Sequence, residues 1–317
     1  MTYFLVTLFL FVVIVIYFRI ADKYNIIDKP NHRSSHTSIT LRGGGIIFPI
    51  AIIVAYFLGY SSLYLTLAVA LVAMISFIDD IKPLHQFPRF SSHLIATALV
   101  LYDIGVPTDM LWMLAVAGVL FIGWINAFNF MDGINGITVL YSLVSIGTFA
   151  YIYQDQSIFQ ELIIMGLSCV VFGFFNVRKK AKTFAGDVGS ISMAVFIGYF
   201  IIKLIFESKQ IGYLLFLSVY GIDAIVTISY RLRNKENIFE AHRSHLYQYL
   251  TNEMKWPHVS VSLLYTALQL VINSITLYFI NNNFMSFVTF LIIGASLMLI
   301  YCVFRIRVLE IIKTKHV

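Results

Sequence analysis

Residues 126–136 read Asn-Ala-Phe-Asn-Phe-Met-Asp-Gly-Ile-Asn-Gly and separate two long apolar runs. Asn126, Asn129 and Asp132 recur at i, i+3 and i+6, so a helix that continues to Asp132 carries them as one polar stripe at its end. Gly133 and Gly136 permit a tight backbone reversal before the next apolar run. Packing a core does not require this pattern, although an ordinary polar helix end with a glycine turn is the structural alternative.

The composition around this stretch is that of a membrane protein. The 317 residues are 59% hydrophobic and 12% charged, and their mean hydropathy is +0.84, whereas about a quarter of the residues in soluble domains are charged. We therefore expect an all-α integral membrane protein. The net charge of +6 is interpreted as loop charge, and no nucleic-acid partner is expected. Cys169 and Cys302 lie in apolar runs without metal-ligand spacing, which indicates helix packing.

Hydropathy predicts a polytopic bundle of about eleven transmembrane helices, each near 20 residues long. The first apolar run lacks the pattern of a signal peptide and is expected to be retained as a span. In the absence of a visible internal repeat or soluble boundary, residues 1–317 are predicted to form a single domain. The predicted spans cover residues 2–20, 44–60, 62–78, 90–106, 110–127, 137–154, 159–175, 188–206, 211–230, 257–280 and 284–304.

An odd number of spans places the two termini on opposite sides of the membrane. If the N-terminus lies outside, every Lys and Arg except Lys203 and Lys209 falls on an inner segment, as the positive-inside rule expects. The sequence thus predicts an outer N-terminus and a cytoplasmic C-terminus. In this topology the polar clusters of five inner loops share the cytoplasmic face.

Two of these inner loops carry acids next to apolar runs. Asp79 and Asp80 are adjacent, and because like charges repel, we expect a bound metal or a nearby Lys or Arg beside them; a solvated helix end is the structural alternative. Residues 184–190, Phe-Ala-Gly-Asp-Val-Gly-Ser, place Asp187 between glycines just before an apolar run. Glycines allow close approach of a ligand, and the following helix N-terminus favours an anion or an anion–metal complex. A turn alone would need only one glycine.

Basic groups occur on further inner loops. His242, Arg243 and His245 lack the additional ligands that zinc requires, so hydrogen bonding to phosphate or sugar oxygens is the functional interpretation, with Arg243 as a forked donor. A basic loop that follows the positive-inside rule is the alternative. Arg42 precedes glycines 43–45, which predict either a backbone nest for phosphate or a flexible entry to the next span. Asp223, inside a predicted span, is either functional or a structural hydrogen-bonding group.

Taken together, the loop motifs resemble those of the polyprenyl-phosphate N-acetylhexosamine-1-phosphate transferases, glycosyltransferase family 4, which include the phospho-MurNAc-pentapeptide translocase branch. The resemblance covers most of the inner loops in order. The motifs that carry it are Asp28-Lys-Pro-Asn-His-Arg33 with His36, the glycines 43–45, Asp79-Asp80, the stretch Asn126-Ala-Phe-Asn-Phe-Met-Asp132-Gly, and residues 184–190.

This resemblance implies a reaction and its participants. Undecaprenyl phosphate would attack a UDP-N-acetylamino sugar at the cytoplasmic face of the bacterial inner membrane, with Mg²⁺, or Mn²⁺ in its place, to give a diphospholipid-linked sugar and UMP. The membrane lipid is a further partner, and a homodimer is an open option for the assembly. The last inner loop departs from the family pattern Asp-Arg-x-His-hydrophobic-His-His. This chain reads His242-Arg-Ser-His245-Leu-Tyr247-Gln248, so only Arg243 and His245 are retained. In this loop the chain resembles the O-antigen-initiating subgroup of the family, which uses deoxygenated amino sugars.

The resemblance also implies roles for individual residues. Asp79, Asp80 and Asp187 match the family's catalytic acids, and Asp187 and Asn129 match its metal ligands. Its substrate-binding positions are matched by Arg89, Asn126, Asp132, Arg243 and His245, and Arg42 beside the glycine run is a further substrate-binding candidate.

The chemistry can also be argued from charge. A phosphate monoester is mostly dianionic at pH 7 and needs little help from a base, so the obstacle is bringing it to an anionic pyrophosphate. A metal held by Asp187, Asn129 and one of Asp79 or Asp80 would reduce that repulsion. We expect these paired acids to position the lipid phosphate or its metal, with no covalent adduct. An ion-coupled transporter is the main alternative, although transporters usually carry repeats and midplane charges; a non-catalytic scaffold is a second.

Overall fold

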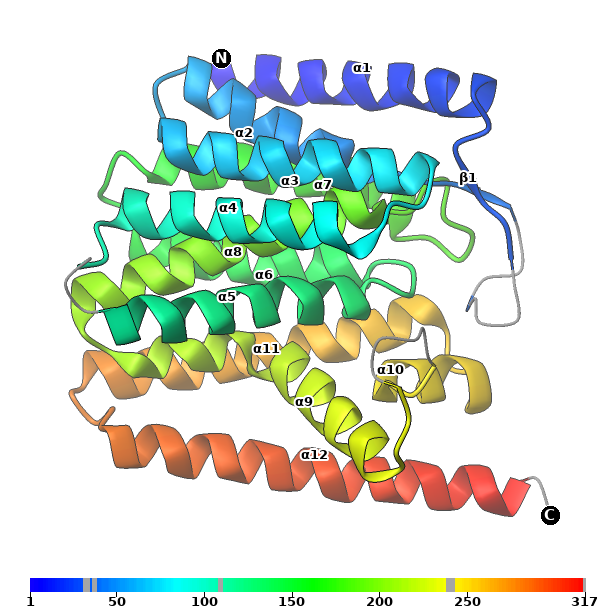
Figure 1. The fold of residues 1–317 in the computed structure, drawn as a ribbon, viewed down its shortest axis with the longest axis vertical. Helices are drawn as coiled ribbons and strands as arrows, with labels where there is room; N and C mark the ends of the chain where they lie inside the picture. The colour runs from blue at the N-terminus through cyan, green and yellow to red at the C-terminus, as the bar shows by residue number, and fades with distance from the viewer. Residues whose placement is uncertain (31–34, 36–38, 108–110, 238–242, 316–317) are drawn as a thin grey trace.

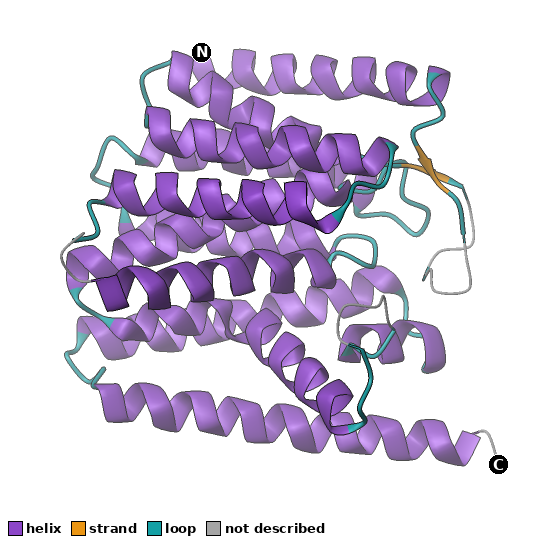
Figure 2. Ribbon diagram, in the orientation of Figure 1, coloured by secondary structure: helices purple, strands orange, loops and turns teal. Residues whose placement is uncertain are grey.

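The computed structural model describes residues 1–30, 35, 39–107, 111–237 and 243–315. Helices dominate it, and two antiparallel strands of two residues each form a small hairpin within the described residues (Figures 1 and 2). The elements are α1 (Thr2–Lys23), β1 (Ile27–Asp28), β2 (Thr40–Leu41), η1 (Gly44–Ile46), α2 (Ile47–Phe57), α3 (Leu63–Ile81), α4 (Gln86–Ile104), α5 (Leu111–Met131), α6 (Ile137–Ile152), α7 (Phe159–Asn176), α8 (Gly186–Ser208), η2 (Ile211–Leu217), α9 (Ser218–Arg233), α10 (Leu246–Gln248), η3 (Tyr249–Glu253), α11 (His258–Asn281) and α12 (Phe287–Lys315).

Eight helices of the described chain are long and apolar enough to cross a membrane. The all-α polytopic fold is thereby confirmed. The second and sixth predicted spans coincide with the shorter apolar helices Gly44–Phe57 and Ile137–Ile152, and the fourth coincides with the more polar α4, so the count of eleven stays a prediction. The start of α1 and the end of α12 lie at opposite ends of the bundle (Figure 1).

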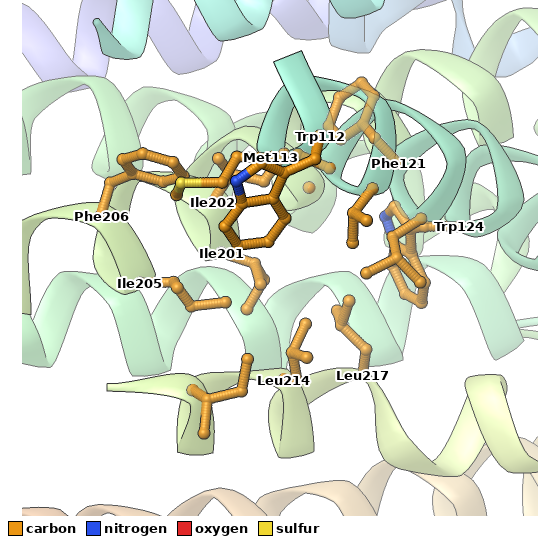
Figure 3. Close-up of a pocket in the computed structure, with 15 residues that line it drawn as sticks. Trp112, Met113, Phe121, Trp124, Ile201, Ile202, Ile205, Phe206, Leu214 and Leu217 are labelled. Carbon is orange, nitrogen blue, oxygen red and sulfur yellow. The ribbon is translucent and has the colours of Figure 1, made fainter. Parts of the chain in front are cut away.

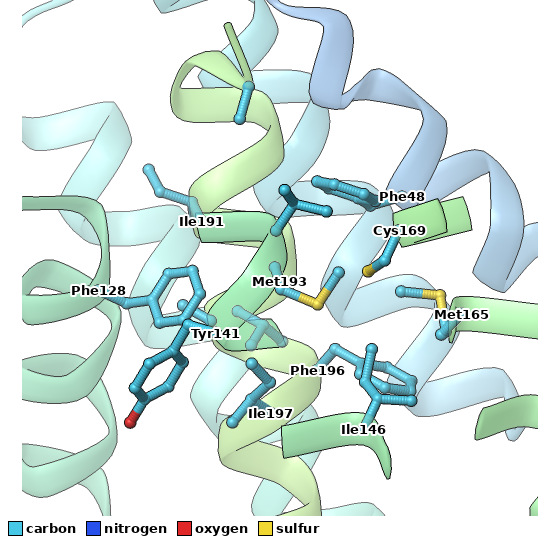
Figure 4. Close-up of a cluster of buried hydrophobic side chains, with 14 of the residues drawn as sticks. Phe48, Phe128, Tyr141, Ile146, Met165, Cys169, Ile191, Met193, Phe196 and Ile197 are labelled. Carbon is cyan, nitrogen blue, oxygen red and sulfur yellow. The ribbon is translucent and has the colours of Figure 1, made fainter. Parts of the chain in front are cut away.

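The centre of the bundle is α8, which is buried along most of its length. Its side chains pack against α3, α5 and α6, and a helix that is apolar on all sides is expected in such a position. Figure 4 shows Met193 and Phe196 of α8 among side chains from α2, α5, α6 and α7, with Cys169 beside them. Both cysteines are free, and Cys169 is fully buried, as expected for helix packing.

The start of α8 lies unusually close to η1. A Cβ atom added to Gly45 would overlap Gly189 of α8 and the carbonyl oxygen of Ala185. The amides of Gly44 and Gly45 donate to the carbonyl oxygens of Phe184 and Ala185, at 2.9 and 3.0 Å. The amides of Gly44 and Gly45 are therefore bonded within the protein. The glycine run allows close backbone packing, and these two amides are not available for the phosphate nest that the sequence also predicted.

The ninth predicted span is broken in the structure. It begins as the 3₁₀ helix η2 and continues as the oblique helix α9 (Figure 1). Gln269 of α11 is fully buried at the break, where its Oε1 accepts from the Val219 amide and its Nε2 donates to the Leu215 carbonyl oxygen, both at 3.0 Å. Backbone groups freed by a helix break in an apolar environment need such partners. One side chain from a neighbouring helix thus stabilises the bend.

Candidate active site

The end of α3 meets the start of α8 at one end of the bundle, and Asp80 joins the two helices. Its fully buried carboxylate accepts from the backbone amides of Asp187 and Val188, each at 3.0 Å. These amides are at the second and third positions of α8, where a helix has donors without intrahelical partners. Asp80 therefore caps α8 from another helix, and its negative charge complements the helix dipole.

Two arginines compensate the charges of the acids. Arg42 Nε lies 2.7 Å from Asp80 Oδ1, and Arg89 Nη1 lies 3.1 Å from Asp79 Oδ2. The expectation of a basic partner beside the paired acids is thus met by one arginine for each acid. Both arginines also reach Asp187, at 3.6 Å from Arg42 and 3.1 Å from Arg89. The two ion pairs consequently converge on a third acid.

Asn129 brings α5 into the same cluster. Its Nδ2 donates to Asp187 Oδ1 at 3.2 Å and to Ser190 Oγ at 2.9 Å. Since both acceptors surround the amide nitrogen, the amide oxygen is left for another donor or a cation. Residues from α3, α4, α5, α8 and the segment before η1 therefore meet in one place, as the sequence predicted for Asp79, Asp80, Arg89, Asn129 and Asp187.

A polar cavity of about 210 Å³ opens beside this cluster. Asp132, one residue past the end of α5, lines it and accepts a hydrogen bond from the Thr138 hydroxyl. Burial raises the pKa of Asp132 to about 7; the nearby charges of Asp187 and Asp80 act in the same direction, against Thr138 and Arg42. The lining consists of Asp28, Ser35, Arg42, Asn129, Asp132, Gly133, Ile134, Asn135, Asn176, Phe184, Gly186, Asp187, Gln248 and His258.

The donor atoms of the cavity suit a hard divalent cation. Asp187, Asp132 and the amide of Asn129 supply oxygen atoms to one space, and Mg²⁺ prefers oxygen ligands and retains several waters. No group of three His, Cys, Asp or Glu side chains is arranged as a metal cage in the part of the chain described. A magnesium ion here would thus rely on one or two carboxylates, water and substrate phosphate, which is its usual coordination when it acts on phosphates.

Three residues predicted for the site lie in other surroundings. Asn126 donates to the Ile122 carbonyl oxygen of its own helix at 2.8 Å. His245 is buried, with Nδ1 2.9 Å from Asp223 Oδ1, and Arg243 is half-buried in the same loop. Among the described residues, none of the three lines the cavity. Asn31, His32, Arg33, His36 and His242, which belong to the predicted motifs, lie outside the described residues.

Asp223 has a structural environment in the bundle. Its two carboxylate oxygens lie 2.9 Å from His245 Nδ1 and 2.7 Å from the Tyr265 hydroxyl. Arg305 of α12 donates to Thr227 Oγ1 and the Ser244 carbonyl oxygen, both at 2.8 Å. The acid that the sequence left open between two roles is thus the centre of a buried network that ties the last inner loop to α11.

Sequence reasoning missed Asn135 and Gln248 as cavity residues. Asn135 is 4% exposed, and its Nδ2 donates to the Arg178 carbonyl oxygen at 2.8 Å. Its Oδ1 is buried and has no hydrogen-bond partner among the described residues, so its acceptor capacity is left for a ligand. Gln248 was noticed only as a departure in the last inner loop. The available signal for Asn135 was its position just before Gly136 in the polar stretch.

Fold and site together define a polytopic membrane protein with a charged cavity at one end of its helical bundle. The model of glycosyl transferase family 4 matches residues 62–205, the segment that carries α3, α4, α5 and α8. Over this segment, a little under half of the chain, the match agrees with the family that the loop motifs indicated.

Curated relatives agree with this family. A Bacillus subtilis strain 168 protein named probable undecaprenyl-phosphate N-acetylglucosaminyl 1-phosphate transferase is 26% identical over 73% of this chain and 71% of its own. The undecaprenyl-phosphate alpha-N-acetylglucosaminyl 1-phosphate transferase of Escherichia coli K12 is 27% identical over 77% and 74%. The phospho-N-acetylmuramoyl-pentapeptide-transferase of Lactococcus lactis strain MG1363 is 28% identical over 62% and 68%. These relatives are polyprenyl-phosphate sugar-1-phosphate transferases, which supports the same general reaction here.

Proposed function

We propose that this protein transfers an N-acetylamino-sugar 1-phosphate from a UDP-sugar to undecaprenyl phosphate and releases UMP, which initiates a surface glycan of the O-antigen type. The observation that carries the proposal is the convergence of Asp79, Asp80, Asp187, Arg42 and Arg89 beside a polar cavity at one end of an apolar bundle. Such a place can hold charged phosphates while a lipid tail stays in the membrane.

The charges of the cluster suit a reaction between two anions. Arg42 and Arg89 present guanidinium groups around Asp187, and forked donors of this kind bind phosphate oxygens well. Asp187, Asn129 and Asp132 would hold Mg²⁺, which when bound supplies charge neutralisation for phosphoryl transfer. The buried Asp80 carboxylate already accepts two amides and an arginine, which favours a positioning role over nucleophilic attack.

The lipid tail has an apolar groove available to it. This groove, of about 200 Å³, is lined by side chains of α5, α8 and η2, and Figure 3 shows Trp112, Phe121 and Trp124 on one side with Leu214 and Leu217 on the other. Since α5 also carries Asn129 at its end, a tail in the groove would follow the helix that leads to the charged cluster. The groove supports a polyprenyl substrate.

The donor sugar would be read by the polar side of the cavity. Asn135 Oδ1 would accept a hydrogen bond from the nucleotide or the sugar, because it is buried without a hydrogen-bond partner among the described residues. Gln248, in the last inner loop that departs from the family pattern, lines the same space. Its amide offers neutral hydrogen bonds, which are compatible with a deoxygenated amino sugar such as N-acetylquinovosamine or N-acetylfucosamine.

The test is a direct assay of the purified full chain. It is incubated with undecaprenyl phosphate, Mg²⁺ and one UDP-sugar at a time, chosen from UDP-GlcNAc and its deoxygenated analogues, and UMP is measured. We expect UMP only when the lipid phosphate is present, with the highest rate for one sugar, and loss of the signal with EDTA. UMP formed from none of the donors, or formed equally without lipid phosphate, would contradict the proposal.

A further inference from the structure

A second groove lies at the end of α1, apart from the charged cavity. Its volume is about 480 Å³, and it lies between α1, the β1–β2 hairpin and the loop before α8. The end of α1 and strand β1 are neighbours in Figure 1, at the end of the bundle that carries the candidate active site. The residues that define the groove here are Phe18, Arg19, Asp22, Ile27, Leu41 and Lys182.

The groove carries an excess of positive charge. Arg19 and Lys182 are exposed, and no ion pair joins either of them to an acid within the described residues. The Nζ atom of Lys182 lies 5.8 Å from the centre of the Phe18 ring, which holds the cation over the groove. Asp22 offsets one charge, and the adjacent Lys23 restores the excess.

An apolar stripe of α1 leads to this charge. Phe9, Val12, Ile16 and Ile20 are exposed, and their spacing of three and four residues places them on one face of the helix. Because α1 is long and apolar enough to span a membrane, this face lies against hydrocarbon. Arg19 lies beside Ile20 at the end of the stripe, at the level where lipid headgroups are expected.

We propose that the groove binds the headgroup of an anionic phospholipid, with its phosphate between Arg19 and Lys182 and its acyl chains along the exposed face of α1. The combination of two cations that form no ion pair within the described residues and an apolar path of helix length selects an anionic lipid over a free soluble anion. This lipid is distinct from the polyprenyl substrate, and the inference does not depend on which sugar is transferred.

The position of the groove gives the bound lipid a consequence for the active site. Leu41, which lines the groove, accepts hydrogen bonds through its carbonyl oxygen from the Phe184 amide at 2.8 Å and the Thr183 hydroxyl at 3.0 Å. The next residue is Arg42, which pairs with Asp80 at 2.7 Å. A headgroup in the groove would therefore support the back of the strand that delivers Arg42.

The experiment measures lipid retention by the full chain. The purified protein is released from micelles that contain equal amounts of phosphatidylglycerol and phosphatidylcholine, and the bound lipids are counted by native mass spectrometry. We expect phosphatidylglycerol to be preferred. Because a basic residue near an anionic surface contributes about fivefold in affinity, the Arg19→Ala/Lys182→Ala variant should lose roughly 25-fold of that preference.

A matched control removes two exposed charges elsewhere. Arg307→Ala/Lys313→Ala removes the same net charge from α12. We expect this variant to keep the preference for phosphatidylglycerol within about twofold. A loss confined to R19A/K182A would mark a binding site and would exclude general electrostatic attraction to the protein. Hydrogen exchange of the unmodified chain is compared in phosphatidylglycerol and phosphatidylcholine nanodiscs. Slower exchange at residues 18–27 and 40–42 in phosphatidylglycerol would support the same location. Equal retention by both double variants, or displacement of the lipid by excess inorganic phosphate, would overturn the proposal.

Discussion

Asp187 is the residue on which the charged groups of the site converge. Arg42, Arg89 and Asn129 approach its carboxylate from three different segments. The sequence indicated this acid through its flanking glycines, and indicated Asp79 and Asp80 through their adjacency. It could not show which arginine pairs with which acid, because those pairs join residues as far apart in the chain as Arg42 and Asp187 and depend on how α3, α4 and α8 pack.

Replacing Asp187 with Asn tests its role at constant shape. The amide keeps one acceptor oxygen but removes the negative charge that would hold Mg²⁺, so we expect UMP release to fall by about 100-fold or more. The thermal unfolding midpoint should change little. Asp155→Asn, on an exposed turn, serves as the control. Activity of the Asp187 variant within a few-fold of the unmodified chain would rule out a metal-binding role.

Asp132 predicts a pH dependence of stability. Its pKa is raised to about 7, chiefly by burial, so it ionises in the unfolded chain before it does in the folded protein. The stabilisation is complete below about pH 4 and is lost as the pH rises to about 7, at roughly 1.4 kcal/mol per unit of pKa difference. Asp132→Asn should escape this loss and gain relative stability across that window.

The measurement is the thermal unfolding midpoint of both proteins in detergent with EDTA, from pH 4 to pH 8. We expect the difference between Asp132→Asn and the unmodified chain to grow up to about pH 7 and then level off. Parallel curves across the whole range would show that the carboxyl of Asp132 titrates normally in the folded protein.

Helix α8 shows how one element organises the site. It is the most buried candidate span, and its first turn receives the Asp80 carboxylate in place of a cap from its own Ala185. Hydropathy predicted where this helix lies within two residues at each end. The cap from α3 could not be predicted, since capping patterns in sequence describe only neighbours along the chain.

The cap predicts unequal effects for the two adjacent acids. An Asn at position 80 has one acceptor oxygen for two backbone amides, so a buried N–H loses its partner at a cost of about 1–3 kcal/mol. An Asn at position 79 can still accept from the Leu84 amide, which Asp79 now does at 2.6 Å. Asp80→Asn should therefore lower the thermal midpoint more than Asp79→Asn. Equal midpoints for the two variants would refute the capping role.

At the scale of the whole molecule, the charge bias and the fold agree. The ends of α1 and α3 and the strand β1, which adjoin loops predicted to be inner, lie at one end of the bundle (Figure 1). Most helix bounds follow the hydropathy within a few residues, although α12 continues to Lys315, beyond the predicted end at residue 304. The break in the ninth span was missed because η2 and α9 form one apolar run in the sequence. The bend depends on Gln269, some fifty residues away, which local periodicity does not reveal.

The inner location of the active-site end can be tested by labelling. Cysteines 169 and 302 are replaced with Ser, and a single Cys is introduced at Ser157 or at Lys180, which are exposed at opposite ends of α7. We expect a membrane-impermeant maleimide to label the Ser157 variant on intact cells, and the Lys180 variant only after lysis. The reverse pattern would invert the orientation and place the cavity outside.

The Gln269 clamp has a consequence for how a long substrate enters and leaves. Because its hydrogen bonds to Val219 and Leu215 use protein groups alone, the slant of α9 is part of the resting architecture. The apolar groove that η2 lines with α5 and α8 is then present in the resting protein. A polyprenyl tail would therefore enter and leave this groove by diffusion within the bilayer, without a preceding conformational opening.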